Sequence, residues 1–422
     1  MNTALEELLS PTGLALVDSL AGYSEDSALA TSSKLRAAGH SPELVSAVLT
    51  QARLRAKAGA KFGPFAERML FTAAGLEQAT RLTTAVHHAR RYLQAGVTKV
   101  ADLTSGIGSD SMAFAALGLA VHATDIDEQT AAIAAHNLAP FPEAAVHHAD
   151  GLATDFTAEG INGIYADPAR RTGAGKRIFD PADYLPALDA VWNLRSQVPA
   201  VGIKVGPGIQ HEALPADCEA QWVSSNGDVV EAGLWFGPLA ARLGRSALLL
   251  AERDGNQDSR EYVGHGPDTE AGALASPDQL GRFLFEPDGA VIRAGLVADC
   301  AVDYGARLTH PTIAYFTGDQ ASDGANHAIA LAHGYVITDC LPYNVKALRS
   351  YLRARNIGRV TIKKRGISVT PEQLRPQLQL RGDQECTIVL TRIGNSKYAI
   401  IVQPLGTSSS SGGIAKPSKE NA

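Results

Sequence analysis

Apolar residues recur with helical spacing throughout the first part of the chain. Residues 1–95 contain the segments ALEELL, SPELVSAVLTQARLRAKA and LEQATRLTTAVHHARRYLQAG, in which apolar side chains return every three or four positions. This spacing is typical of helices with one buried face. Ser41 followed by Pro42 is a helix start signal, because Ser caps free backbone amides and Pro fits the first helical turn. We therefore expect a helical amino-terminal region over residues 1–95.

From about residue 96 the pattern changes to short apolar runs that alternate with helical segments. The runs are VTKVADL, AVHATDI, AAVHHAD, GIYADP and AVGIKVG, with segments such as SMAFAAL and QTAAIAAHNL between them. Such alternation predicts parallel strands joined by right-handed helical crossovers. Two further apolar runs flank Asn226-Gly227-Asp228, a turn typical of an antiparallel hairpin. Residues 96–253 therefore predict a doubly wound, Rossmann-like α/β domain.

The remainder of the chain divides by composition. Residues 254–280 are polar and turn-rich, which indicates a linker or a long loop. A small α/β domain is expected over residues 281–339, with a ferredoxin-like arrangement as one option. Residues 340–405 combine the helical stretch NVKALRSYLRARN with three apolar runs. Residues 406–422 are rich in Ser and Gly and are expected to form a disordered tail.

Length and composition are those of a globular protein of about three domains, with 422 residues, 45% hydrophobic and 19% charged. No apolar run approaches the roughly 20 residues of a membrane span, and the amino terminus lacks the basic start of a signal peptide. We expect a soluble, cytoplasmic protein with no membrane partner. The cysteines form no CxxC pair, so we expect free thiols and neither disulfides nor a metal site. They are Cys218, Cys300, Cys340 and Cys386.

The net charge of -6 conceals a division along the chain. Residues 341–405 carry +9, whereas the rest of the chain carries -15. A basic segment attracts a polyanion that an acidic body repels, so we expect this segment to bind nucleic acid, with a solvated helix face as the alternative. Its basic residues are Lys346, Arg349, Arg353, Arg355, Arg359, Lys363, Lys364, Arg365, Arg375, Arg381, Arg392 and Lys397.

The strand that ends at Asp102 leads directly into a glycine-rich turn before the next helix. Glycines at such a turn let a ligand approach the backbone and the amides of the helix start, which indicates a nucleotide-like cofactor. Ser111 stands where a dinucleotide-binding GxGxxG motif has its third Gly. Asp102 would repel a pyrophosphate and favour a cationic ligand such as S-adenosylmethionine. The cofactor residues expected here are Asp102, Thr104, Gly106, Gly108 and Asp110.

Three more predicted strands end in an acid. Asp125 follows Asp102 by 23 residues, the usual place for an acid that binds ribose hydroxyls. Asp150 is placed to accept a hydrogen bond from an adenine amine, with Gly151 leaving access. Four strand-end acids in a row favour S-adenosylmethionine over a generic doubly wound fold. The further cofactor residues expected are Asp125, Ile126, Asp150, Gly151 and Asp167.

Four strings, together with the glycine-rich turn, carry a resemblance to a known family. They are KFGPFAERMLFTAAGLEQAT (61–80), ADPARR (166–171), FEPDGAVIRAGL (285–296) and IKKRGISVTPEQL (362–374). The sequence resembles the class I S-adenosylmethionine-dependent methyltransferases, and more closely the bacterial ones with a carboxyl-terminal THUMP-like domain. The resemblance implies a seven-stranded, mostly parallel sheet with a terminal antiparallel hairpin. It also implies an RNA-binding, THUMP-like domain over residues 340–405.

The end of the fourth strand resembles the motif of methyltransferases that modify exocyclic amines of nucleobases, which reads Asp or Asn, Pro, Pro and an aromatic residue. The resemblance implies that Asp167 and the carbonyl of Pro168 accept hydrogen bonds from the amine and orient it for transfer. Ala169 and Arg170 depart from the motif and remove the aromatic ring that would stack on a base. Arg170 is a candidate to stack on the base or hold a phosphate. Other candidates for stacking, with a place in the core as the alternative, are Phe62, Phe179 and Tyr184.

These patterns together predict methyl transfer to a base nitrogen of structured RNA, either tRNA or rRNA, with no obligate protein partner. For Lys204, a contact with substrate phosphate and an ion pair with a neighbouring Asp are equal alternatives. Two other functions stay open: a methyltransferase of a small molecule or protein, and a non-catalytic RNA-binding protein. The expected catalytic residues are Asp167, Pro168 and Arg170, and the expected substrate-binding residues are Arg171, Lys204, Lys363, Lys364 and Arg365.

Overall fold

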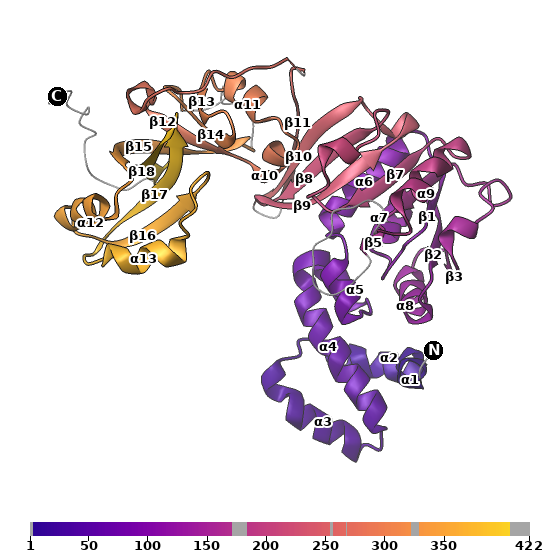
Figure 1. The fold of residues 1–422 in the computed structure, drawn as a ribbon. Coiled ribbons are helices and arrows are strands. Elements are labelled where there is room, and N and C mark those ends of the chain that lie inside the picture. The colour runs from indigo at the N-terminus through magenta and orange to yellow at the C-terminus, as the bar shows by residue number, and fades with distance from the viewer. Residues whose placement is uncertain (1–2, 171–183, 254–255, 267, 322–328, 406–422) are drawn as a thin grey trace. The chain divides into compact units, whose positions relative to one another are not determined.

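The computed structural model describes residues 3–170, 184–253, 256–266, 268–321 and 329–405. The chain forms two compact units, residues 1–259 and 260–422 (Figure 1). Arg171, Phe179 and the expected tail over residues 406–422 lie outside the described residues. Within the described ranges, no helix combines the length and the apolar character that crossing a membrane requires.

The first unit begins with the helical region expected from the sequence. Its helices are α1 (Thr3–Leu9), α2 (Pro11–Asp18), α3 (Ala28–Ala37), α4 (Pro42–Phe62), α5 (Ala73–Gln78) and α6 (Leu82–Gln94). α4 starts as predicted, because the Ser41 side chain accepts a hydrogen bond from the backbone N–H of Leu44 and Pro42 is its first residue. One face of α4 is buried against α1, α2 and α3 through side chains such as Val45 and Val48.

A sheet of nine described strands follows, in the order β11-β10-β8-β9-β7-β4-β1-β2-β3. The strands β1 to β4 and β7 are parallel to one another, and β9 runs antiparallel to both β7 and β8. The strands are β1 (Lys99–Asp102), β2 (Ala120–Asp125), β3 (Ala144–His148), β4 (Gly163–Ala166), β7 (Val201–Val205), β8 (Glu219–Ser225), β9 (Asp228–Trp235), β10 (Gly244–Arg253) and β11 (Asn256–Val263). The connecting helices include α7 (Ser109–Ala116), α8 (Glu128–Leu138) and α9 (Leu188–Trp192).

The predicted hairpin is present, and the sheet extends beyond it. β8 and β9 pair antiparallel about Asn226 and Gly227, whose φ angles of 52° and 87° suit a tight hairpin turn. β10 then adds to the free edge of β8 in parallel, and β11 follows it. The sheet is therefore wider by two strands than the seven expected, and β11 occupies the start of the segment expected as a linker.

An aromatic cluster forms the centre of the first unit. Tyr92 of α6 packs edge-on against Phe114 of α7, with ring centroids 5.0 Å apart, and against Trp235 of β9 at 6.4 Å. Its hydroxyl donates to the Ile164 carbonyl at 2.5 Å. A Cβ on Gly202 of β7 would lie 2.4 Å from that hydroxyl and 2.6 Å from the Trp235 ring. The sheet therefore needs glycine at this position, because a side chain would collide with the Tyr92 hydroxyl and the Trp235 ring.

The described strands of the second unit form a single sheet where the sequence suggested two domains. Its order is β13-β14-β12-β15-β18-β17-β16. The elements are β12 (Phe283–Pro287), α10 (Gly289–Arg293), α11 (Val297–Asp303), β13 (Arg307–His310), β14 (Ile313–Gly318), β15 (Ala332–Pro342), α12 (Val345–Ala354), β16 (Ile357–Lys364), α13 (Pro371–Leu378), β17 (Gln384–Ile393) and β18 (Ser396–Pro404).

The boundary expected at residues 339 and 340 falls inside β15, which pairs with β12 on one side and β18 on the other. Along β17, Ile388 and Leu390 enter the core beneath α12 and α13, whereas Val389 enters the core on the opposite face. Because strand residues alternate between faces, the same strands serve both cores. In the described structure, Cys218, Cys300, Cys340 and Cys386 form no disulfide.

We expect Gly202→Ala to lower the free energy of unfolding by about 1–3 kcal/mol, because the added methyl group overpacks the site between Tyr92 and Trp235. Gly59→Ala is the matched control. Gly59 lies on an exposed part of α4 with no atom within 4 Å of the added Cβ, so this change should leave stability equal or raise it by up to about 1 kcal/mol. Urea unfolding followed by circular dichroism measures both. Equal stability of the two variants would contradict the packing role of Gly202.

Candidate functional site

A pocket of about 550 Å³ opens where β1, β2 and β4 end, and the turn leading from α5 to α6 closes one side of it. This volume is in the range of about 300–1,000 Å³ that is typical of ligand sites. The described residues that line it include neither Lys nor Arg, but they include five acids. A negatively charged wall of this kind favours a cationic ligand. The acids are Asp102, Asp110, Asp125, Asp150 and Asp167.

The glycine-rich turn after β1 binds the acid at the end of β2. Gly106 has a φ of 53°, which favours glycine, and its N–H donates to Asp125 Oδ2 at 3.1 Å. The N–H of Asp127 donates to the other carboxylate oxygen at 2.9 Å. Ile126 stands 60% exposed beside them at the pocket wall. Asp125 is thereby held at the pocket next to an apolar surface.

Asp102 lines the pocket from a buried position. It accepts a hydrogen bond from Ser111 Oγ at 2.6 Å and one from the Thr104 N–H at 3.3 Å. Burial raises the pKa of Asp102 to about 7, with the nearby charge of Asp110 acting in the same direction. The carboxylate therefore changes charge near neutral pH, and a cation in the pocket would favour its ionised form.

Asp167 follows β4 and is fixed on two sides. Its N–H donates to Thr104 Oγ1 at 2.6 Å, and its Oδ2 lies 2.5 Å from Lys204 Nζ. Of the two alternatives for Lys204, the structure thus shows the ion pair with Asp167. Burial raises the pKa of Asp167, and the Lys204 charge opposes that rise.

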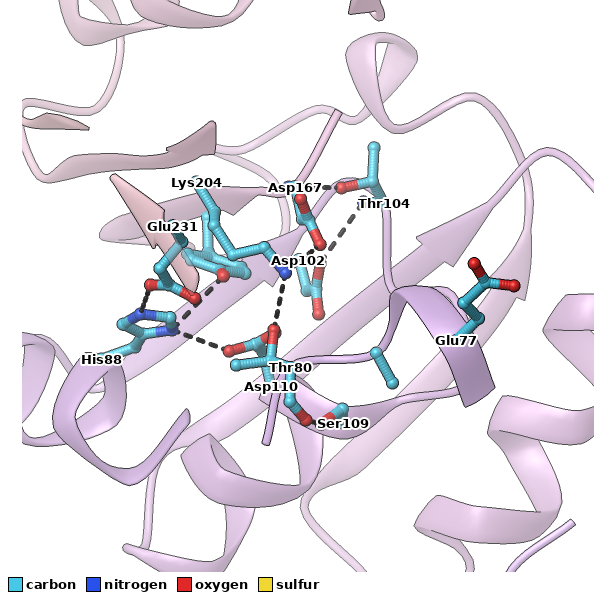
Figure 2. Close-up of polar contacts among 12 residues, drawn as sticks. Glu77, Thr80, His88, Asp102, Thr104, Ser109, Asp110, Asp167, Lys204 and Glu231 are labelled. Carbon is cyan, nitrogen blue, oxygen red and sulfur yellow. Dashed lines mark hydrogen bonds and ion pairs between the residues drawn. The ribbon is translucent and has the colours of Figure 1, made fainter. Parts of the chain in front are cut away.

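A chain of hydrogen bonds continues from Lys204 into the core (Figure 2). Lys204 Nζ donates to Thr80 Oγ1 at 2.8 Å, and Thr80 Oγ1 donates to Asp110 Oδ2 at 2.7 Å. His88 then bridges two acids, with Nδ1 2.8 Å from Asp110 Oδ1 and Nε2 2.6 Å from Glu231 Oε1. We call the residues Asp167, Lys204, Thr80, Asp110, His88 and Glu231 the buried charge chain.

The electrostatics of the buried charge chain make His88 a cation. Burial alone would lower its pKa, but the charge of Glu231 and the hydrogen bond to Asp110 raise it to about 10. Both ring nitrogens therefore carry protons and donate to carboxylates. Burial likewise acts to raise the pKa of Asp110, yet the bond and charge of His88 lower it. The opposite charges of His88 and Asp110 therefore favour the ionised form of both groups inside the protein.

The sequence had not indicated Thr80, His88 or Glu231 as part of a site. A His and a Glu on the apolar faces of α6 and β9 were a possible signal, since buried ionisable groups need partners. His88 and Glu231 are 143 residues apart, and only the folded chain reveals that they pair. Asp110, expected to bind cofactor, lines the pocket while both of its carboxylate oxygens contact the buried charge chain.

Two glycines expected at the cofactor lie next to its pocket and serve the packing of the loops. Gly108 precedes α7 with a φ of 89°, a conformation that favours glycine. A Cβ on Gly151 would lie 2.8 Å from Leu103 Cα and 2.6 Å from Thr124 Oγ1. Gly151 therefore permits close contact between neighbouring segments, and Gly108 permits the backbone conformation that starts α7.

The transfer motif continues into a short strand. Pro168 is buried, and β5 (Ala169–Arg170) pairs with β6 (Tyr184–Leu185) at the pocket edge, where Ala169 and Leu185 both line it. The two described candidates for a stacking platform, Phe62 and Tyr184, are only 1% and 3% exposed. They belong to the core, as the alternative interpretation held.

The three other expected substrate residues lie in the second unit. Lys363 Nζ contacts Glu286 Oε2 at 2.6 Å, and Arg365 Nη2 contacts Glu286 Oε1 at 3.2 Å. Lys364 Nζ donates to the Ile367 carbonyl at 3.4 Å. All three basic residues thus have partners within the protein.

The buried charge chain predicts how stability depends on pH. The pKa of His88 is raised from 6.5 to about 10, so its stabilising charge is complete below pH 6.5 and is lost as pH rises through 10. We expect His88→Gln to cost about 3–5 kcal/mol at pH 7, because two buried carboxylates lose their cation, and to flatten the decline of stability between pH 7.5 and 9.5. Urea unfolding over this pH range measures both effects.

His87→Gln is the control for this experiment, since burial and Arg90 lower the pKa of His87 to about 4. His87 is neutral above pH 7.5 in the folded and the unfolded chain, so its substitution should keep the wild-type slope. A His88→Gln variant with the same slope as wild type would show that His88 is not charged in the fold.

Comparison with known proteins agrees with this geometry. Two uncharacterised S-adenosylmethionine-dependent methyltransferases, from the CDC 1551 and H37Rv strains of Mycobacterium tuberculosis, are each 34% identical over 351 residues, which cover 81% of this chain and 91% of each relative. A family model described as THUMP domain-like matches residues 332–404, and a domain of unknown function (DUF8688) matches residues 2–58.

A solved structure shares the fold. The crystal structure of a presumptive methyltransferase from Porphyromonas gingivalis W83 superposes with a TM-score of 0.70 at 20% identity, covering 91% of this chain and 99% of that one. The class I fold and the methyl donor expected from the sequence are thereby confirmed. With 34% identity over 81% of its length, the chain belongs to the S-adenosylmethionine-dependent methyltransferases, and it carries a THUMP-like domain near its carboxyl end.

Proposed function

We propose that this methyltransferase modifies a base nitrogen of structured RNA, either tRNA or rRNA, and that an exocyclic amine is the acceptor. The observation that carries the proposal is the position of Asp167. It lies in the wall of an acidic pocket, directly before Pro168, with Oδ2 held by Lys204 and its N–H held by Thr104. Among the described residues, no donor contacts Asp167 Oδ1 or the carbonyl of Pro168, so both can accept hydrogen bonds from an amine.

The pocket suits S-adenosylmethionine, which when bound supplies a methyl group on positively charged sulfur. Asp125 is the candidate to bind the ribose hydroxyls, because the turns on either side fix both of its carboxylate oxygens. Ile126 offers an apolar surface, and Asp150 is the candidate for the adenine amine. The Ser105 hydroxyl lines the pocket and, within the described chain, has no hydrogen-bond partner. A polar group of a bound ligand would supply the hydrogen-bond partner that the Ser105 hydroxyl lacks.

Asp167 is suited to two tasks at the acceptor nitrogen. As a hydrogen-bond acceptor it would orient the amine and direct its lone pair into the pocket. Its raised pKa also makes it a better base for the proton that the nitrogen loses once it carries a methyl group. Lys204 would hold the carboxylate in place and limit the rise in its pKa.

RNA is the substrate class that the second unit favours. The THUMP domain-like match covers residues 332–404, and nearly all of the +9 segment falls within it. A basic surface separate from the pocket can bind the phosphate backbone of a large substrate, whereas a small metabolite would have no use for it.

The substrate can be identified by incubating the protein with labelled S-adenosylmethionine and total cellular RNA, followed by mass spectrometry of the nucleosides. We expect a methylated base. Asp167→Asn should reduce the transfer rate by about a hundredfold or more, because the amine loses its acceptor and its base. Affinity for S-adenosylmethionine should change little. Asp155→Asn, an exposed acid outside the pocket lining, should transfer at the wild-type rate.

Two outcomes would contradict this proposal. Transfer at the wild-type rate by Asp167→Asn would remove the assigned role of that residue. Label that enters protein or small metabolites but no RNA would replace RNA with another substrate class.

Binding of S-adenosylmethionine should depend on the ionisation of Asp102. Since its pKa in the folded protein is about 7, Asp102 is protonated at lower pH and must release a proton to face a cation. We expect affinity to fall by up to about tenfold per pH unit below pH 7. Calorimetry in buffers of different ionisation enthalpy should detect this proton release at pH 6.5.

Asp102→Asn should bind more weakly at pH 8 and lose the dependence on pH, whereas the exposed control Asp155→Asn should keep the wild-type profile. An unchanged pH profile in Asp102→Asn would assign the titrating group elsewhere.

A further inference from the structure

Eight of the twelve basic residues of segment 341–405 form two groups that differ in their partners in the folded protein. One group has acidic partners: Arg355 lies 3.6 Å from Asp339, and Arg359 lies 3.6 Å from Glu385. Lys363 and Arg365 both contact Glu286. Each of these four residues already has a carboxylate within 4 Å in the second unit, so a phosphate would have to compete with that carboxylate.

The second group lies on α12 and just beyond α13. Lys346, Arg349 and Arg353 are spaced three and four residues apart, which places them on one face of α12. Arg381 joins Arg349 and Arg353 around a shallow hollow between the ends of the two helices. We call Lys346, Arg349, Arg353 and Arg381 the α12 face. Among the described residues, none of the four has an acidic partner, and no acid lines the hollow.

Stability of the helix does not explain this row. Cations near the carboxyl end of a helix, such as Arg353, interact favourably with its dipole. Lys346 is the second residue of α12, where the same dipole disfavours a positive charge. The helix dipole therefore does not stabilise the charge of Lys346. The three cations on one face of α12 together point to a ligand outside the chain.

We propose that the α12 face binds the phosphate backbone of the RNA substrate, and that the Lys363-Lys364-Arg365 string does not. This inference rests on the proposed function and assigns its RNA-binding surface. From Lys346 to Arg353 the helix rises about 10 Å, enough to contact more than one phosphate. The two guanidinium groups of Arg349 and Arg353 can each bind a phosphate through two hydrogen bonds.

Apolar side chains complete the hollow. Leu352 and Leu378 form its floor, and Leu380 is half-buried at its edge. An apolar floor ringed by arginines accommodates the sugar face of a backbone segment while the charges bind the phosphates. The Lys363-Arg365 string has a different task, because Lys363 and Arg365 neutralise Glu286 in β12 and pack over the Tyr335 and Tyr315 rings.

Two double variants of the full-length protein separate this surface from net charge. R349Q/R353Q removes two charges from the α12 face. R355Q/R359Q also removes two charges from the second unit, but Arg355 and Arg359 have acidic partners, Asp339 and Glu385 respectively. Glutamine keeps helix propensity close to that of arginine, so both variants should fold, as circular dichroism will check.

Binding is measured without S-adenosylmethionine, by fluorescence anisotropy with labelled bulk tRNA and with fragmented rRNA at 50–300 mM KCl. The wild-type protein should bind at least one of these RNAs with a strong dependence on salt. R349Q/R353Q should bind it about tenfold more weakly at 100 mM KCl, and the slope of log affinity against log salt should fall by about 1.5, as expected for two lost phosphate contacts. R355Q/R359Q should bind within about twofold of wild type.

Each other outcome overturns the proposal. Equal losses in the two variants would show that net charge alone governs binding, and wild-type affinity in R349Q/R353Q would place the RNA elsewhere. If wild type binds neither RNA but binds labelled polyglutamate through the same residues, the surface belongs to an acidic protein partner. The labelling assay with total RNA is independent of this measurement, so methylated RNA together with unaltered binding by R349Q/R353Q would overturn the surface and retain the proposed function.

Discussion

The cost of burying an unpaired charge governs how the elements around the pocket of the first unit meet. The buried charge chain alternates in sign, with Asp167 beside Lys204, and Asp110, His88 and Glu231 beyond Thr80. Removing Lys204 would leave the Asp167 carboxylate without its cation, and removing His88 would do the same to Asp110 and Glu231. Its members come from β7, β9, α6, α7, the turn before α6 and the residue directly after β4, so satisfying them all fixes how these elements meet (Figure 2). The site is thus specified by electrostatics as much as by packing.

This constraint links the helical amino-terminal region to the pocket. Thr80 and His88 belong to the segment that includes the turn before α6, and this segment both closes the pocket and completes the buried charge chain. Lys61 near the end of α4 donates to three carbonyls of the α5 end, those of Leu76, Glu77 and Ala79. The string over residues 61–80 that carries part of the family resemblance therefore holds one wall of the cofactor site in place.

Charge is used differently in the two units. In the first, acids line a concave pocket. Lys204 and His88 pair with Asp167 and Asp110, whereas, among the described residues, Asp125 and Asp150 accept hydrogen bonds from backbone N–H groups only and keep their charge available to a positively charged donor. In the second, Glu286, Asp339 and Glu385 neutralise one set of cations and leave the α12 face without acidic partners. Ion pairs thus decide which charges remain available to a ligand. A count of charges along the chain gives the right sign for each unit. It cannot tell which charged residues are free to bind a ligand and which are already paired with an opposite charge.

The sequence by itself determined the class of fold, the Gly106 turn and the acids at the strand ends. It also determined the hairpin at Asn226 and Gly227 and the basic carboxyl-terminal segment. Each of these follows from a local pattern: the spacing of apolar residues, a turn motif or the local composition. Tertiary structure alone decided the partners of Lys204, the cationic state of His88, the capture of Lys363 and Arg365 by Glu286, and the single sheet of the second unit. These features depend on contacts between side chains and strands that are distant in sequence. The local spacing of apolar residues carries no information about which buried charges pair or which strands lie side by side.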